Sequence, residues 1–120
     1  MKIDRQVVAF KKYFLEFYER QASNVQAKIE WTLQLIRTTQ QIPEKYFKHI
    51  AGTKGLYEIR VEVGNNIFRI FAFFDKGNLV VLGNGFQKRT QKTPKQELKK
   101  ALKIMEEYFN ETESSPIQKK

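Results

Sequence analysis

Hydrophobic residues recur at helical spacing through the first third of the chain. Residues 11–20 carry aromatic side chains three and four positions apart, which predicts a short helix. A second helix is predicted to follow, with Ser23 or Asn24 as its cap and Pro43 as its stop. The apolar stripe of this helix comprises Val25, Ile29, Leu33 and Ile36, with Trp31 and Leu35 alongside. We expect the aromatic side chains of both helices to pack in the core.

The period of the pattern changes to two in the middle of the chain. Residues 44–56 form a basic connection that contains glycine, and residues 57–63 then alternate apolar with charged side chains. Two apolar runs bounded by turn signals follow at 67–74 and 79–86. These three segments are predicted strands, and residues 5–10 are a fourth, shorter one.

Turn and helix signals complete the outline. Gly64-Asn65-Asn66 and residues 75–78 are tight turns, since glycine and asparagine tolerate positive φ. Pro94 suits the first turn of a final helix, which has its own apolar stripe. The element order predicts an α+β fold, an antiparallel meander with helices on one face. We expect one domain over residues 1–109 and a polar, fraying tail over 110–120.

The two turns predict which side chains share a face of the sheet. The resulting opposed pairs are Val63 with Phe68, Glu62 with Arg69, Phe71 with Leu82, and Arg69 with Asn84. One face is apolar and is expected to lie under the helices. The second face collects Glu58, Arg60, Glu62, Arg69, Asn84 and Lys88, with Phe71 and Phe73 between them. Glu62 and Arg69 could equally form a plain cross-strand ion pair, and the phenylalanines could belong to a second small core.

The charge adds a partner class to this pattern. The chain has 22 basic and 13 acidic residues, a net charge of +9, and the excess is greatest in residues 42–93. Such a surface attracts polyanions, although a merely solvated basic surface is the simpler alternative. Basic side chains hold phosphates and aromatic ones stack unpaired bases, so the second face has the chemistry of an RNA-binding surface. A basic loop extends this surface with Lys88, Arg89, Lys92 and Lys95.

The sequence lacks the residues that several common kinds of catalytic or metal-binding site require. The sequence has no cysteine, a single histidine (His49), and no cluster with metal-ligand spacing. It also lacks a phosphate-binding glycine loop and the residues of a catalytic triad. A nuclease built on this chain is therefore expected to need no metal or cofactor and to use attack by the RNA 2′-hydroxyl on its own phosphate. No apolar run is long enough for a membrane helix or a signal peptide, so we expect a soluble, cytoplasmic protein with no membrane contact.

Three segments resemble a known superfamily of toxins. Gly-Thr-Lys-Gly-Leu-Tyr-Glu-Ile-Arg-Val (52–61), Ile-Phe-Arg-Ile-Phe (67–71) and Asn-Gly-Phe-Gln-Lys-Arg-Thr-Gln-Lys-Thr-Pro-Lys (84–95) resemble the RelE/ParE superfamily, nearest to its HigB-like, phage-derived branch. The resemblance runs from about residue 5 to about residue 109. It implies two N-terminal helices packed on a twisted antiparallel sheet with a C-terminal helix. It also implies a toxin of a type II toxin–antitoxin module that cleaves messenger RNA on the ribosome, leaving a 2′,3′-cyclic phosphate.

The resemblance also implies roles for individual residues. Arg69 falls on the family's active-site arginine and is expected to stabilise the transition-state phosphate. Arg60, with Lys88 or Arg89, is expected to hold the backbone or protonate the leaving oxygen. Glu58 occupies a position that is basic in many members, and it is the candidate proton acceptor. A C-terminal tyrosine of many members has no match near Pro94. Expected RNA-binding residues outside the catalytic set are Lys92, Lys95, Asn84 and Phe71.

The implied partners are the ribosome, messenger RNA and a cognate antitoxin, often of the helix-turn-helix type, through which operator DNA would be contacted. Two alternatives use the same fold. A ParE-like toxin would poison gyrase and cleave no RNA, and a third reading is a non-catalytic RNA- or ribosome-binding module, because a fold does not fix a function. The basic loop beside Arg69 favours the nuclease.

Overall fold

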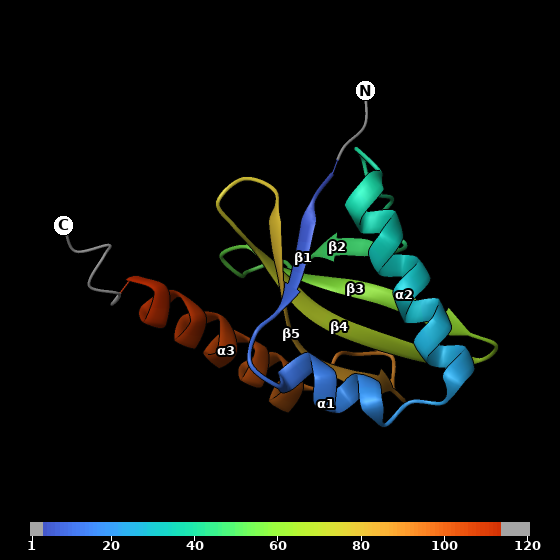
Figure 1. Cartoon of the computed structure of the whole chain (residues 1–120). Helices are drawn as coiled ribbons and strands as arrows, with labels where there is room; N and C mark the ends of the chain where they lie inside the picture. Colours follow the sequence, from blue (N-terminus) through green and yellow to red (C-terminus); the bar gives the residue numbers. More distant parts are fainter. Residues whose placement is uncertain (1–3, 114–120) are drawn as a thin grey trace.

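The computed structural model of the chain describes residues 4–113. Their elements, in chain order, are β1 (Gln6–Ala9), α1 (Tyr13–Glu19), α2 (Ser23–Thr38), β2 (Phe47–His49), β3 (Leu56–Val63), β4 (Asn66–Asp75), β5 (Leu79–Lys88) and α3 (Lys95–Glu113). The strands form one five-stranded sheet in the order β1-β5-β4-β3-β2 (Figure 1). The predicted α+β class is therefore confirmed.

The sheet is mixed rather than wholly antiparallel. Strands β3 to β5 pair antiparallel, as predicted for the meander, and β2 adds a further antiparallel pair to β3, whereas β1 lies parallel to β5. A parallel pair needs a long crossover, and here the crossover includes both N-terminal helices. Strand β2 lies inside the segment that the sequence predicts as a connection. Its three residues are too few to show a period of two.

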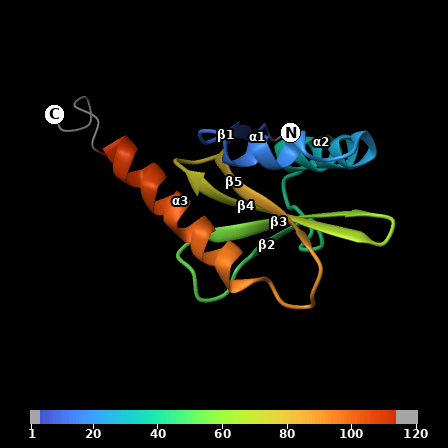
Figure 2. The same ribbon diagram turned by 90° about the horizontal axis from the view of Figure 1, so that it is seen from below.

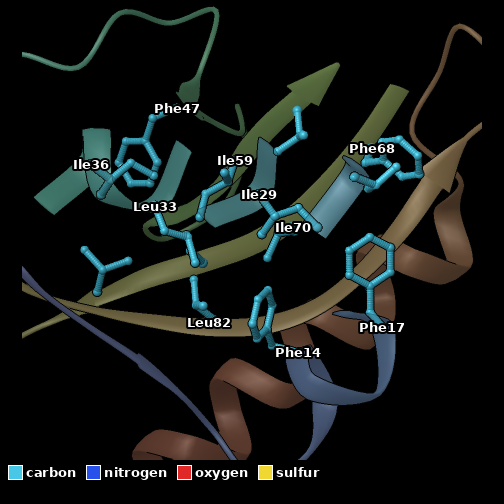
Figure 3. Packing of buried hydrophobic residues seen from close by; sticks show 14 residues of the cluster. Phe14, Phe17, Ile29, Leu33, Ile36, Phe47, Ile59, Phe68, Ile70 and Leu82 are labelled. Carbon is cyan, nitrogen blue, oxygen red and sulfur yellow. The ribbon is translucent and has the colours of Figure 1, made fainter. Parts of the chain in front are cut away.

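Helices cover both faces of the sheet, which corrects the prediction of helices on one face. Helices α1 and α2 lie on one side and α3 crosses the other, as the view from below shows (Figure 2). The larger core joins α1 and α2 to the sheet through Phe14, Phe17, Ile29, Ile36, Ile59, Phe68 and Ile70, among others (Figure 3). Trp31 is an exception to the expected core packing of the helical aromatics, because 48% of its surface is exposed.

A second core lies between the sheet and α3. It contains Leu56, Phe71, Phe73, Val81, Phe86 and Ala101. The end of α3 is fixed by polar contacts: Tyr108 Oη donates to Asp75 Oδ2 at 2.6 Å, and Lys11 Nζ lies 2.6 Å from Glu107 Oε2. Burial and the Asp75 contact raise the pKa of Tyr108 to about 12. The stripe of α3 therefore completes the fold on the face that the sequence predicts to be open.

The first hairpin keeps the predicted faces but not the predicted pairs. Its turn contains only Gly64 and Asn65, and Gly64 has a φ of +58°. Val63 consequently pairs with Asn66, and Arg60 pairs with Arg69. The pairing differs from the predicted one by two residues. Side chains alternate with a period of two, so a displacement of this size leaves each side chain on its predicted face.

The second hairpin contains an irregularity that the sequence analysis missed. Asp75 pairs with Leu79 rather than with Asn78, so Leu82 pairs with Ala72 and joins the larger core instead of facing Phe71. A register shift between Ile70 and Ala72 marks a β-bulge on β5. After the bulge, the even-numbered residues of β5 again lie on the second face of the sheet, as predicted, and α3 covers part of that face.

The ends of the helices also differ from prediction. The N-cap of α2 is Ala22, with no capping hydrogen bond from a side chain, so neither Ser23 nor Asn24 is the cap. The helix ends at Thr38, before it reaches Pro43. Helix α3 continues through residues 110–113 of the predicted tail, and residues 114–120 lie outside the described residues.

Candidate active site

Four charged side chains gather where β3, β4 and β5 lie side by side. Glu58 and Arg60 come from β3, Arg69 from β4, and Lys88 from the end of β5. Arg60 and Arg69 are directly opposed across the two strands. Two like charges in this position repel each other, so the arrangement requires a compensating anion nearby.

Glu58 supplies that anion. Its Oε1 accepts a hydrogen bond from Arg60 Nε at 3.1 Å and lies 3.5 Å from Arg69 Nε. The second contact is an ion pair without hydrogen-bond geometry, and Arg69 Nε has no hydrogen-bond partner among the described residues. Another nitrogen of the same guanidinium donates to the Phe68 carbonyl oxygen at 3.2 Å. Glu62, the predicted partner of Arg69, instead lies opposite Ile67 and is exposed.

The four side chains of this cluster differ in how far they are exposed to solvent. Only 6% of the Arg69 side chain and 9% of the Glu58 side chain is exposed, against 29% for Arg60. Lys88 is partly exposed. The accessible cations are therefore Arg60 and Lys88, and they lie above a nearly buried Glu58–Arg69 pair.

The pKa values of two cations of the cluster, Lys88 and Arg69, are lowered. Burial lowers the pKa of Lys88, and the positive charges of Arg69 and Arg60 lower it further, against an opposing effect of Glu58. Burial also lowers the pKa of Arg69, although Glu58 opposes this. A lysine whose pKa is lowered gives up its proton more readily, which suits it to general acid catalysis.

A surface cavity of about 650 Å³ adjoins Lys88. It lies between the tip of the β3–β4 hairpin and the loop after β5, and it is lined by Asn65, Asn66, Ile67, Gln87, Lys88, Arg89, Thr90 and Gln91. Arg89 donates to Gln87 Oε1 at 3.1 Å, and Gln87 Nε2 donates to Asn66 Oδ1 at 3.3 Å. Amide and guanidinium groups of this kind form hydrogen bonds with base edges. The sequence analysis missed the amides, which come together only through the pairing of β4 with β5.

Comparison with protein-family models matches residues 16–106 to the description "Phage derived protein Gp49-like (DUF891)". This match covers most of the chain. The chain belongs to the Gp49-like family. The family is part of the RelE-like group and often comprises toxins of toxin–antitoxin modules, so the match supports a toxin role. A comparison with curated protein sequences finds no significant match.

Two predicted RNA-binding residues of this Gp49-like protein are structural instead. Phe71 is fully buried and stacks on Phe86 with ring centroids 5.7 Å apart, because α3 covers this part of the sheet. Asn84 is 2% exposed, and its Nδ2 donates to the Glu97 carbonyl oxygen at 3.2 Å and to Glu97 Oε1 at 3.1 Å. These contacts join β5 to α3. They correct the expectation that Phe71 and Asn84 touch RNA.

The other predicted residues lie at the surface of the Gp49-like domain. Arg89 and Lys92 are exposed on the loop after β5, and Lys95 is exposed at the start of α3. His49 contacts the Thr53 carbonyl oxygen at 3.2 Å and the ring of Tyr57, which gives it a packing role.

Residues 4–113 contain no group of three or more His, Asp or Glu side chains placed to hold a metal ion. In the same range, no helix has the length and apolar character needed to cross a membrane.

Proposed function

We propose that this protein is the toxin of a type II toxin–antitoxin module and that it cleaves messenger RNA on the ribosome, as in the HigB-like branch. The observation that supports this most is the cluster of Glu58, Arg60, Arg69 and Lys88. It combines accessible cations, a buried carboxylate and a lysine of lowered pKa at one point of a basic surface. Cleavage through the RNA 2′-hydroxyl is accelerated by a proton acceptor, a proton donor and cations that stabilise the phosphate charge, and these groups can supply all three.

The proposed reaction is an in-line displacement within the RNA. The 2′-oxygen attacks the adjacent phosphorus, the bond from phosphorus to the 5′-oxygen breaks, and a 2′,3′-cyclic phosphate and a 5′-hydroxyl result. Glu58 accepts the 2′-hydroxyl proton through Oε2, since both arginine contacts use Oε1. Lys88 donates a proton to the departing 5′-oxygen. Arg60 binds the phosphate and stabilises the charge that develops on it.

Arg69 has a different role in this proposal from the one expected from the sequence. Two of its nitrogens are turned to groups of the protein, Nε to Glu58 Oε1 at 3.5 Å and Nη1 to the Phe68 carbonyl oxygen at 3.2 Å, so we assign it no direct contact with RNA. It is instead a positioning residue that balances the Glu58 charge and lowers the pKa of Lys88. Arg89 lines the adjoining cavity, where it can contact the nucleotide next to the cleaved bond.

The experiment is primer extension on messenger RNA in a translating extract, with purified wild-type protein and three variants. Arg60→Ala and Lys88→Ala each remove an accessible cation from the cluster. Lys99→Ala is the control because it removes the same charge from an exposed position on α3. The expected result is ribosome-dependent cuts within translated codons that Arg60→Ala and Lys88→Ala reduce about 100-fold or more and that Lys99→Ala leaves unchanged.

Growth arrest without such cuts would contradict the proposal, and gyrase-dependent DNA breaks would then identify a ParE-like toxin.

We also propose a cognate antitoxin, of helix-turn-helix type, that contacts operator DNA for the complex. Because the net charge is +9, we expect an acidic segment of the antitoxin to cover the basic surface.

A further inference from the structure

A tryptophan stands exposed on α2, away from the charged cluster. Trp31 has 48% of its surface exposed, and its ring meets the edge of Tyr46 at a centroid distance of 5.5 Å. Lys28 Nζ lies 4.7 Å from the centroid of the Trp31 ring, and Lys45 Nζ lies 5.1 Å from that of Tyr46. We call Lys28, Trp31, Lys45 and Tyr46 the Trp31 patch. Each of its two rings has a cation beside it.

The Trp31 patch borders an open groove of about 440 Å³ between α2 and the end of β3. The groove is lined by Asn24, Ala27, Lys28, Trp31, Glu62 and Val63. Strand β2 pairs with β3 only as far as Ile59, so the groove adjoins a part of β3 that β2 does not cover. Glu62 is two residues from Arg60 on β3, which places the groove on the same strand as the charged cluster.

The surroundings of Trp31 decide which class of partner fits. A protein interface usually has an apolar centre and buries about 800 Å² on each partner. The other exposed large hydrophobic residues, Val8 on β1 and Leu15 on α1, lie on elements away from β2 and β3. Trp31 is therefore the one large hydrophobic side chain exposed on this part of residues 4–113, and the groove beside it adds only the smaller apolar residues Ala27 and Val63. An exposed aromatic ring with adjacent lysines suits a flat, anionic ligand, and an unpaired nucleotide is such a ligand.

We propose that the Trp31 patch stacks an unpaired base of an RNA strand and that Lys28 and Lys45 hold its phosphates. The site is separate from the cleavage cluster and deepens the proposed function, on which it rests for the choice of RNA as partner. Glu62 is the one acidic side chain of the groove lining. It repels phosphate, so the RNA backbone lies on the Lys45 side of Trp31.

The test uses the fact that Trp31 is the only tryptophan of the chain. Its fluorescence is followed while a single-stranded 2′-O-methyl oligonucleotide is added, which blocks the attacking hydroxyl and so prevents cleavage. The expected result is saturable quenching by the oligonucleotide and none by polyphosphate of equal charge. In Lys99→Ala the fluorescence should be quenched to the same extent as in the wild type, because this exposed lysine of α3 belongs to neither site.

Binding measured by filter retention gives the size of the effect. Trp31→Ala should weaken oligonucleotide binding about 5- to 140-fold, the equivalent of ~1–3 kcal/mol for one stacked base. Trp31→Phe should recover most of this loss. The double variant Lys28→Gln/Lys45→Gln should lower the slope of log affinity against log salt by about 1.4 for a single strand. Thermal unfolding checks that each variant is folded.

The outcomes separate this proposal from the proposed function. Binding of the oligonucleotide without quenching, or unchanged affinity in Trp31→Ala, would overturn the Trp31 site. If the wild-type protein still cleaved messenger RNA, the proposed function would stand without it. Quenching by the oligonucleotide in a protein that cleaves nothing would support the Trp31 site and overturn the nuclease proposal.

Discussion

Replacing Glu58 by glutamine should leave a charge stranded inside the protein. Glu58 and Arg69 are 9% and 6% exposed at their side chains, with 3.5 Å between Oε1 and Nε. At that distance, with an effective dielectric constant of about 20, their attraction is roughly 5 kcal/mol before any desolvation is considered. Removing one partner of a buried pair typically costs about 3–5 kcal/mol, because the other remains desolvated.

The expected loss lies at the lower end of that range. Glutamine keeps an oxygen that can accept a hydrogen bond, and Arg60, at 29% exposure, adds at most about 1 kcal/mol to the pairing. We therefore expect Glu58→Gln to lower the free energy of unfolding by about 3 kcal/mol. For a domain of this size, that corresponds to a fall in Tm of roughly 10 °C.

Urea unfolding at neutral pH measures this loss, and the chain offers a matched control. Glu62→Gln makes the same chemical change two residues along β3, at an exposed position, and should cost no more than about 0.5 kcal/mol. In Glu58→Gln/Arg69→Met the stranded charge is also removed, so the double variant should be more stable than Glu58→Gln alone. If Glu58→Gln cost no more than Glu62→Gln, or if the double variant were additive, the reasoning would be refuted.

Four further predictions follow from the site and the core. Gly85→Ala should lower the free energy of unfolding in urea by about 1–3 kcal/mol, because an added Cβ would lie 2.6 Å from Phe17 Cδ2. At Gly83 the nearest contacts of an added Cβ are at 3.6 Å, so Gly83→Ala should be tolerated. Equal losses in the two variants would contradict this reasoning. Phe71→Ala should cost about 3–5 kcal/mol by removing a fully buried ring, and a well-folded variant that had lost only RNA affinity would restore a binding role. The rate of single-turnover cleavage should fall as pH rises through the pKa of Lys88, since a general acid must be protonated. Because that pKa is lowered, the fall should begin below the ordinary lysine value of about 10.4, and Lys88→Arg should move the fall to higher pH. A cleavage rate that stayed unchanged up to pH 10 would exclude this role of Lys88. The affinity of the toxin–antitoxin complex should decrease with added salt, and calorimetry showing no dependence on salt would argue against an acidic antitoxin segment.

The alternation of side chains was predictable because it does not depend on the exact pairing of strands. The first hairpin is displaced by two residues from its predicted pairs, yet Glu58, Arg60 and Arg69 share the expected face. The direct opposition of Arg60 and Arg69 was not predictable, since it depends on whether Gly64 or Asn65 begins the turn. The sequence pattern therefore identified the members of the cluster but not the contacts among them.

The placement of α3 could not be read from its own stripe, because an apolar stripe does not indicate which surface it will meet. The signal for the position of α3 was on the sheet. Phe71 and Phe73 place two large rings at one end of a face whose other end is charged, which indicates that this end is covered. Gly83 and Gly85, two positions apart in a strand, were the sign of a bulge. The parallel pairing of β1 leaves no local trace, because its partner is far away in the sequence.

The pairing of β1 with β5 affects how the protein folds during synthesis. Val7 pairs with Val80, so β1 has no strand partner until β5, the last strand of the sheet in chain order, has been translated. Helix α3, which covers the second core, is made later still. Contacts between such distant segments form slowly. The sheet therefore cannot close until β5 has been synthesised, and any interaction that depends on the closed sheet begins only after that point.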